Sequence, residues 1–178
     1  MQDYHYKQLL HDRGICVVIP TYNNVGTIVD VVNRVLMQCI DVIVVNDGST
    51  DGTAELVREI KDITLIDNQI NRGKGTALKR GFKKALELGF SYAITLDADG
   101  QHYPEDIPLL LKANVKHPGC IIMGLLFSTI NISNSLIVSI TSLIISLKTL
   151  FSWFLSTALP NFLDTENATL VLLSEEIL

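Results

Sequence analysis

The sequence predicts an α/β fold built on a mostly parallel sheet with helices on both of its faces. Four short apolar runs, rich in β-branched residues, alternate with segments whose apolar residues recur at helical spacing. The runs are continuously apolar, as in strands that are covered on both sides. With 178 residues the chain has the size of one domain that can bury a core.

Two strand–helix units come first. The run "GICVVIP" (14–20) predicts a buried strand that a proline closes. The next segment predicts an amphipathic helix, with apolar residues at Val25, Ile28, Val29, Val32 and Leu36. "DVIVVNDGSTDGT" (41–53) predicts a second strand that runs into a loop of Gly, Asp and Ser, and "TAELVREIK" predicts the helix that follows.

Two further units complete the alternation. "ITLID" (63–67) predicts a third strand, and the loop "NQINRGKG" (68–75) separates it from a predicted helix, "TALKRGFKKALELG" (76–89). We expect the basic face of that helix to be solvated. "SYAITLD" (91–97) predicts the fourth strand, and "PEDIPLLLKANVKH" (104–117) predicts a helix with proline near its start.

Charge and cysteine content exclude some functional classes. The formal net charge of -5 and the pI near 5.3 argue against nucleic acid as a partner. Cys16, Cys39 and Cys120 lack metal-ligand or redox spacing, and an odd number of scattered thiols fits a reducing compartment. The polar start "MQDYHYKQLLHDRG" is no secretory signal, so we expect a cytoplasmic location.

Composition changes sharply in the last third of the chain. Residues 118–147 contain no charged side chain, so we place a boundary between a core (14–124) and an apolar region (125–178). The stretch 121–147 is long enough to cross a bilayer, but its Ser and Asn residues favour a patch lying on the membrane. The protein would then be peripheral on, or anchored in, the inner membrane face through 121–155. A buried core segment is the alternative.

The loop "NRGKGT" invites comparison with phosphate-binding motifs. A Walker loop needs glycine at position 68 and Ser or Thr at position 75, but Asn68 and Gly75 stand there. A dinucleotide fingerprint fails as well, because no third small residue closes the pattern after Gly73 and Gly75. Both motifs are excluded.

Two carboxylates, Asp97 and Asp99, follow the fourth predicted strand. The carboxyl ends of parallel strands meet at one edge of a sheet, so "PTYNN", "NDGSTDGT" and "DADGQH" should converge there. A hard cation such as Mg²⁺ or Mn²⁺ takes such oxygen ligands together with phosphate and water. His102, in the same loop, could join this shell. The alternative is a solvated turn in which Asp97 caps the next segment.

Four motifs in order, "VVIPTYNN", "VIVVNDGSTDGT", "NRGKGTALKRG" and "ITLDADGQH", resemble those of family 2 glycosyltransferases. The branch of dolichyl- or polyprenyl-phosphate sugar synthases is the most similar. The resemblance is good over 14–124 and weak beyond. It implies a GT-A (Rossmann-like) fold, a UDP- or GDP-hexose donor, a divalent cation, and inverting transfer to a polyprenyl phosphate or glycan acceptor.

The resemblance also implies roles for the acids. Asp99 would hold the metal, and Asp97 would lie near the metal or the ribose. Asp47 would contact the base or ribose of the nucleotide, and the preceding position, often Asp in relatives, is Asn46 here. Asp51 is either a further nucleotide contact or the cap of the helix that follows.

The remaining nucleotide contacts implied by the resemblance come from two loops. Pro20, Tyr22 and Asn23 match the first loop, whose backbone lines the nucleobase pocket, and Tyr22 could instead pack in the core. Asn24 stands where the family commonly has Glu, so the base contact would be altered. Lys74, between two glycines, would approach the diphosphate as a point charge.

Beyond Gly124 the family pattern degrades. Asp164 keeps the acid of the last motif and is a candidate acceptor-site carboxylate, but Glu166, Ala168 and Leu170 depart from the family residues, and an expected Arg is missing. A second hypothesis is therefore a truncated or degenerate module that binds nucleotide sugar with little transfer. A nucleotidyltransferase fits less well, since its N-terminal glycine-rich loop is absent.

Overall fold

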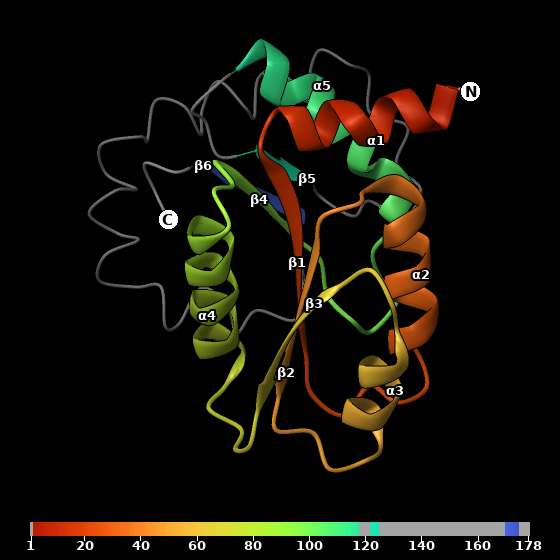
Figure 1. Cartoon of the computed structure of the whole chain (residues 1–178), viewed down its shortest axis with the longest axis vertical. Coiled ribbons are helices and arrows are strands. Elements are labelled where there is room, and N and C mark those ends of the chain that lie inside the picture. Colours follow the sequence, from red (N-terminus) through yellow and green to blue (C-terminus); the bar gives the residue numbers. More distant parts are fainter. Residues whose placement is uncertain (1, 118–121, 125–169, 175–178) are drawn as a thin grey trace.

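The computed structural model of the chain describes residues 2–117, 122–124 and 170–174. Within these residues, six strands form one sheet in the order β3-β2-β1-β4-β6-β5. The first four strands run parallel, whereas β6 is antiparallel to both of its neighbours, β4 and β5. The predicted α/β fold with a mostly parallel sheet is confirmed (Figure 1).

The parallel strands agree closely with the predicted ones. Their bounds are β1 Ile15–Thr21, β2 Val42–Asp47, β3 Thr64–Asn68 and β4 Tyr92–Thr95. The antiparallel strands, which were not predicted, are β5 Ile122–Gly124 and β6 Leu170–Ser174. Because β4 ends at Thr95, both Asp97 and Asp99 lie in the loop beyond the strand.

Five α-helices and one 3-10 turn complete the described part of the chain. They are α1 Gln2–Asp12, α2 Ile28–Gln38, α3 Thr53–Glu59, α4 Lys74–Glu87, η1 Pro104–Asp106 and α5 Ile107–Lys116. Helix α1 was not predicted. The helix predicted over 104–117 begins instead with the 3-10 turn η1.

The described helices are divided unequally between the two faces of the sheet (Figure 1). Among them, only α4 covers one face, where Leu78 and Phe82 pack against Val18 and Val45. Helices α1, α2, α3 and α5 contribute to the larger apolar cluster on the other face. Helices on both faces were expected, and this expectation is confirmed.

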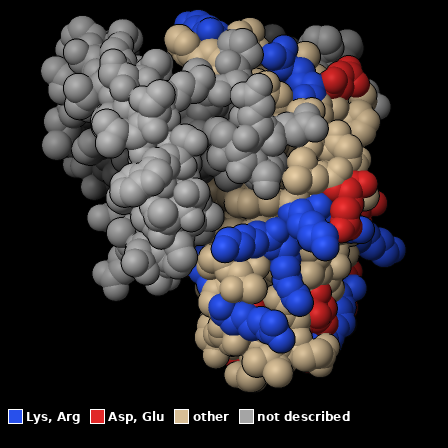
Figure 2. Space-filling view, turned by 90° about the vertical axis from the view of Figure 1, so that its left-hand side faces the viewer, with Lys and Arg blue, Asp and Glu red and all other residues tan. Residues whose placement is uncertain are grey.

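Gly81 lets helix α4 pack closely against the sheet. A Cβ at this position would overlap the side chain of Val18 and come within 3.2 Å of Val45 Cγ2. On the outer side of α4, Lys79 and Lys83 are exposed, as predicted for a solvated basic face. Figure 2 shows Lys and Arg side chains gathered on this side of the molecule.

The expectations for the second half of the chain are tested only in part. Strand β6 comes from residues beyond position 124 but pairs directly with β4 of the core sheet. Most of the apolar stretch 121–147 lies outside the described residues. In the part of the chain that the structure describes, no helix combines the length and apolar character needed to span a bilayer.

Candidate functional site

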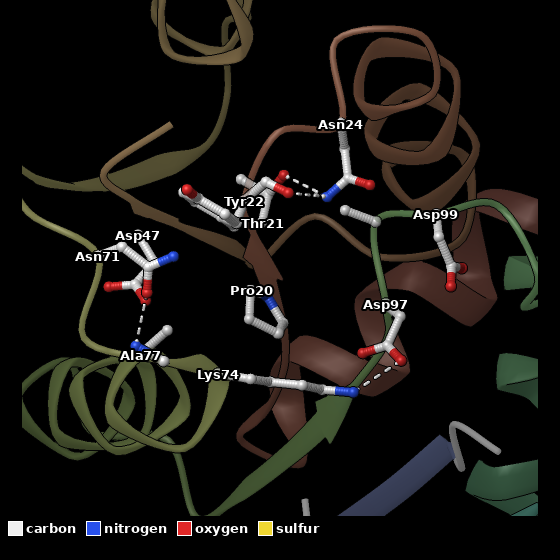
Figure 3. A pocket seen from close by; sticks show the side chains of 12 residues that line it. Pro20, Thr21, Tyr22, Asn24, Asp47, Asn71, Lys74, Ala77, Asp97 and Asp99 are labelled. Atoms are coloured by element: carbon white, nitrogen blue, oxygen red, sulfur yellow. Dashed lines mark hydrogen bonds and ion pairs between the residues drawn. The ribbon is translucent and has the colours of Figure 1, made fainter. Parts of the chain in front are cut away.

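A pocket of about 290 Å³ opens at the carboxyl ends of β1, β2 and β4 (Figure 3). Four loops reach it: those after β1, β2 and β4, and the loop that leads from β3 into α4. Its lining consists of Pro20, Thr21, Tyr22, Asn24, Asp47, Asn71, Gly73, Lys74, Ala77, Asp97, Ala98 and Asp99. The four motifs therefore converge at one edge of the sheet, as the sequence predicts.

Asp47 ends β2 and is only 2% exposed. Its Oδ1 accepts a hydrogen bond from Asn68 Nδ2 (3.0 Å), and its Oδ2 accepts one from the backbone N–H of Arg72 (3.0 Å). Asn68 in turn accepts a hydrogen bond from Arg80 of α4. The carboxylate is held in place by its own chain, at the wall of the pocket.

Gly48, directly after Asp47, allows the two loops on this side to approach closely. Its φ of +74° lies in the left-handed region, and a Cβ there would lie 2.6 Å from the backbone nitrogen of Asn71. Only glycine fits such a contact without displacing the backbone. The position of Asn71 in the pocket lining depends on this close approach.

Asn46 faces Asp67 across the ladder between β2 and β3. Asn46 Nδ2 donates to Asp67 Oδ1 (2.7 Å), and Arg58 Nη2 donates to Asp67 Oδ2 (2.5 Å). Burial opposes ionisation of Asp67, but these hydrogen bonds outweigh it and lower the pKa of the carboxyl. Asp at position 46 would instead set two carboxylates side by side, which explains why an amide suits this chain.

Asn23 ties two loops together rather than lining the pocket. Its backbone N–H donates to Ser49 Oγ (3.0 Å), and its Oδ1 accepts from the N–H of Thr50 (2.9 Å). Ser49 Oγ donates onward to Asn46 Oδ1 (2.5 Å). The left-handed backbone of Asn23, with φ of 55°, makes this arrangement possible. The predicted nucleotide contact of Asn23 stays a prediction.

The rest of the first loop lines the pocket as expected. Asn24 Nδ2 donates to Thr21 Oγ1 (3.2 Å) and to the carbonyl of Tyr22 (3.1 Å), so this amide braces its own loop. Pro20 forms the floor beside them (Figure 3). Tyr22 is 45% exposed, which excludes the alternative that it packs in the core.

Asp51 has a structural role at the start of α3. Its Oδ1 accepts hydrogen bonds from Thr53 Oγ1 (2.6 Å) and the Thr53 N–H (3.0 Å), and its Oδ2 accepts one from the N–H of Val25 (3.0 Å). The bond from Thr53 is the main reason that the pKa of Asp51 lies below its ordinary value. Asp51 is not among the described residues that line the pocket; it binds the first residue of α3, Thr53, although Gly52 occupies the cap position itself.

On the opposite wall, Lys74 and Asp97 form an ion pair. Lys74 begins α4, and its side chain crosses the pocket to place Nζ 2.8 Å from Asp97 Oδ2 (Figure 3). Asp99 lines the same wall and accepts the backbone N–H of Gln101 at Oδ1 (2.9 Å). Two carboxylates and one ammonium group therefore face the cavity from this side.

His102 lies behind the pocket wall. It is 2% exposed, and its Nδ1 accepts the backbone N–H of Asp97 (3.3 Å). The imidazole is not part of the pocket lining. This histidine supports the loop that carries Asp97, and its place in a metal or diphosphate shell stays a prediction.

The donor set suits a hard divalent cation. Asp97 and Asp99 offer carboxylate oxygens, and the Lys74 ammonium shows that Asp97 already accepts a positive charge at this place. Within residues 2–117 and the two described strands beyond, no group of three or more metal-ligating side chains occurs. A Mg²⁺ or Mn²⁺ ion would thus need further oxygen ligands from a bound phosphate and water.

Sequence reasoning missed some of the lining residues, and one candidate lies outside the described part of the chain. Asp164 lies outside the described residues. Sequence reasoning did not assign Asn71, although it adjoins the "RGKG" loop, and it did not assign the small lining residues Thr21, Ala77 and Ala98. Small side chains carry no chemical signal in a sequence, so only the three-dimensional arrangement reveals them.

Comparison with known sequences gives a consistent result. The profile described as "Glycosyl transferase family 2" matches residues 16–154. A UDP-N-acetylglucosamine–dolichyl-phosphate N-acetylglucosaminyltransferase of Methanococcus voltae is 36% identical over 118 residues, covering 57% of this chain and 47% of that protein. A poly-beta-1,6-N-acetyl-D-glucosamine synthase of Staphylococcus aureus is 39% identical over 111 residues, covering 59% of this chain and 26% of that protein.

Solved structures show the same fold. Glucosyl-3-phosphoglycerate synthase from Mycobacterium tuberculosis, in complex with UDP, has a TM-score of 0.59 at 19% identity, covering 98% of this chain and 61% of that one. The same enzyme with Mn²⁺, UDP-glucose and phosphoglyceric acid gives a TM-score of 0.58 at 20% identity, with the same coverage. The predicted GT-A-like fold is confirmed.

The chain spans less than half the length of the two curated relatives named above. The family profile nevertheless covers most of the chain, including every loop that lines the pocket. Together with the pocket and the strand order, this match identifies the chain as a member of the family 2 glycosyltransferases.

Proposed function

We propose that the pocket binds a nucleotide sugar together with a divalent cation. The nucleobase and ribose lie against the loop after β1 and the Asp47 carboxylate. The diphosphate lies between Lys74 and a Mg²⁺ or Mn²⁺ ion held by Asp97 and Asp99. The observation that carries this proposal is the convergence of a fixed, buried carboxylate and a pair of cation-binding carboxylates in one pocket.

Each group has a chemical task in this arrangement. Asp47 has both oxygens engaged by donors of its own chain and still offers lone pairs to a hydroxyl or a base N–H. Tyr22, half exposed at the pocket mouth, offers an aromatic face on which a base can stack. Asn24 replaces the common Glu with a neutral amide, so it contributes hydrogen bonds without charge.

The proposed reaction is inverting transfer of a hexose. An acceptor oxygen attacks the anomeric carbon, the bond from this carbon to the diphosphate oxygen breaks, and the bonding electrons stay on the diphosphate. When bound, a divalent cation neutralises the charge that develops on that leaving group. Lys74 adds a second positive charge beside the phosphates.

The donor and acceptor are proposed from the relatives. Both curated relatives carry N-acetylglucosamine in their names, and the compared crystal structures contain UDP or UDP-glucose. We therefore propose a UDP-sugar, with UDP-N-acetylglucosamine as the first candidate and a GDP-hexose as the alternative. The proposed acceptor is a polyprenyl phosphate or a glycan. A phosphate acceptor is ionised at neutral pH and needs no general base, whereas a glycan hydroxyl would have to give its proton to a carboxylate on the acceptor side.

We assign donor binding and acceptor binding to the two parts of the chain that differ in composition. Residues 14–124 bind the nucleotide sugar, and residues 125–178 form the acceptor side, with Asp164 as its carboxylate and an apolar surface toward the membrane. The degraded motif at Glu166, Ala168 and Leu170 favours a second candidate function, a nucleotide-sugar-binding module with little transfer. A single missing transition-state donor typically costs about 10²–10³ in rate.

A donor panel tests the proposal. Calorimetry with UDP-N-acetylglucosamine, UDP-glucose and GDP-mannose in Mn²⁺ should show affinity for one nucleotide class, and labelled sugar from that donor is then offered to polyprenyl phosphate in vesicles. Binding with transfer supports the enzyme, and binding without transfer supports the second candidate. Lack of affinity for every donor would exclude both.

A further inference from the structure

We propose that Lys74 makes cation binding and nucleotide binding depend on each other. In the free chain Lys74 holds Asp97, and when a nucleotide enters, Lys74 moves to the diphosphate and releases Asp97 to the cation. This inference rests on the proposed function and adds to it a coupling residue and an order of events.

The ammonium group of Lys74 occupies the position next to Asp97 Oδ2 that a bound cation would need. Its Nζ lies 2.8 Å from Asp97 Oδ2, because the Lys74 side chain extends from the start of α4 across the pocket to this carboxylate (Figure 3). The side chain of Lys74 is 34% exposed and that of Asp97 is 17% exposed, so the pair is only partly solvated. Among the described residues, neither side chain has a second ion-pair partner.

Competition follows from charge. An ammonium group and a divalent cation repel each other at contact distance, so they cannot share Asp97 Oδ2 in this geometry. A bare cation must therefore displace Lys74, bind Asp97 Oδ1 close to the repelling ammonium, or bind through Asp99 and water. The described residues offer no third metal-ligating side chain nearby to compensate. The free chain should bind Mn²⁺ weakly.

A nucleotide diphosphate removes the competition. It offers Lys74 another anionic partner, and the flexible stem of a lysine lets the ammonium move without a change in the backbone. Helix α4 begins at Lys74, so its first turn and the lysine charge face the same side of the pocket. Because linkage is reciprocal, a nucleotide that frees Asp97 raises cation affinity by the factor by which the cation raises nucleotide affinity.

The test compares Lys74→Met with wild type in three titrations: Mn²⁺ alone, UDP alone in EDTA, and Mn²⁺ in the presence of saturating UDP. Free Mn²⁺ is followed by electron paramagnetic resonance, which requires no turnover. We expect Lys74→Met to bind Mn²⁺ alone at least about threefold more tightly, as loss of a competing ion pair implies. It should bind UDP alone more weakly, and UDP should raise its Mn²⁺ affinity by a smaller factor than in wild type.

Lys79→Met is the matched control. Lys79 lies on the same helix, is exposed and is not part of the pocket lining, so it removes the same charge without touching Asp97. Lys74→Arg keeps the charge and should bind Mn²⁺ alone as weakly as wild type. Circular dichroism checks that each variant folds, and Lys74→Gln serves as the neutral variant should Lys74→Met not fold.

Two results would overturn the inference. One is an unchanged or weaker affinity of the neutral Lys74 variant for Mn²⁺ alone. The other is an equal gain in Lys79→Met, which would trace the effect to net charge. Failure of the proposed function looks different, because wild type would then bind UDP neither with nor without Mn²⁺.

Discussion

The two sides of the pocket are built differently. On the Asp47 side, the carboxylate is 2% exposed and both of its oxygens accept hydrogen bonds from the chain itself. On the Asp97 side, the carboxylate meets a single lysine side chain, and Asp99 is exposed to solvent. On the first side, the hydrogen bonds of the carboxylate are already formed without a ligand. On the second side, the ion pair must break before Asp97 can bind a cation.

One pocket can thus contain both a fixed carboxylate that binds the nucleotide and a second carboxylate whose partner changes when ligand binds. A carboxylate that is held by backbone and amide donors loses little entropy when a nucleotide binds, which favours affinity. A carboxylate that is paired with a mobile lysine can exchange this partner for a cation. We infer that the Asp47 side supplies recognition of the nucleotide and that the Asp97 side supplies the response to the diphosphate.

The largest expected effect is that of Asp99→Asn. The substitution removes one of the two carboxylates that the described residues place on the Asp97 side, and it should abolish the gain in nucleotide affinity that Mn²⁺ produces. Affinity for UDP in EDTA should change little, since Asp47 remains in place. Calorimetry with and without Mn²⁺ measures both. A folded variant that keeps the full Mn²⁺-dependent gain would remove Asp99 from the cation site.

Asp47→Ala should weaken the binding of UDP itself, whether or not Mn²⁺ is present. UDP affinity should fall by about 1–3 kcal/mol even in EDTA, because a charged acceptor is lost and two donors of the chain lose their partner. Asp30→Ala, on the solvent-exposed side of α2, is a control that removes equal charge outside the pocket. Equal UDP affinities in Asp47→Ala and wild type would contradict the role of Asp47.

The ladder between β2 and β3 supports the Asp47 side and can be tested through stability. Asn46→Asp would bring two carboxylates together at Asp67 and should lower the free energy of unfolding by about 1–3 kcal/mol. The double variant with Asp67→Asn restores an amide–carboxylate pair and should recover most of the loss. Urea denaturation of the two single variants and the double variant measures the coupling. Additive losses would show that the pair is not coupled.

The smallest expected effect lies far from the pocket, where His11 of α1 meets Asp41 at 2.8 Å. This hydrogen bond, together with the charge of Asp41, raises the pKa of His11 above its ordinary 6.5. The stabilisation is therefore complete below about pH 6.5 and is lost as pH rises through the raised pKa. Because the pair is exposed, we expect a change in Tm of only about 1–2 °C, and His11→Gln should remove it. A pH profile of Tm that the substitution leaves unchanged would contradict this.

The sequence predicted the parallel core well because its strands and helices carry strong periodic patterns. It did not predict β6, because a short apolar segment does not reveal which distant strand it joins. Helix α1 was missed because "QDYHYKQLLHD" contains few apolar residues at helical spacing. Elements that depend on tertiary partners leave weak local signals.

In the site, too, the positions of residues could be predicted from local patterns, whereas contacts between distant residues could not. The pocket position of Asp47, Lys74, Asp97 and Asp99 could be predicted, because each lies at or beyond the end of a strand, or near the start of a helix, at the shared sheet edge. The ion pair between Lys74 and Asp97 could not, since it depends on which way a long side chain turns. The pairing of Asn46 with Asp67 depends on strand register, which the sequence alone does not specify.

A preformed nucleotide side and a cation side that the ligand completes can be distinguished by titrating the wild-type chain with UDP, first in EDTA and then in Mn²⁺. We expect measurable UDP affinity in EDTA and a clear gain in affinity with Mn²⁺. Affinity that is the same in both conditions, or that is absent in EDTA and appears only with Mn²⁺, would contradict this expectation.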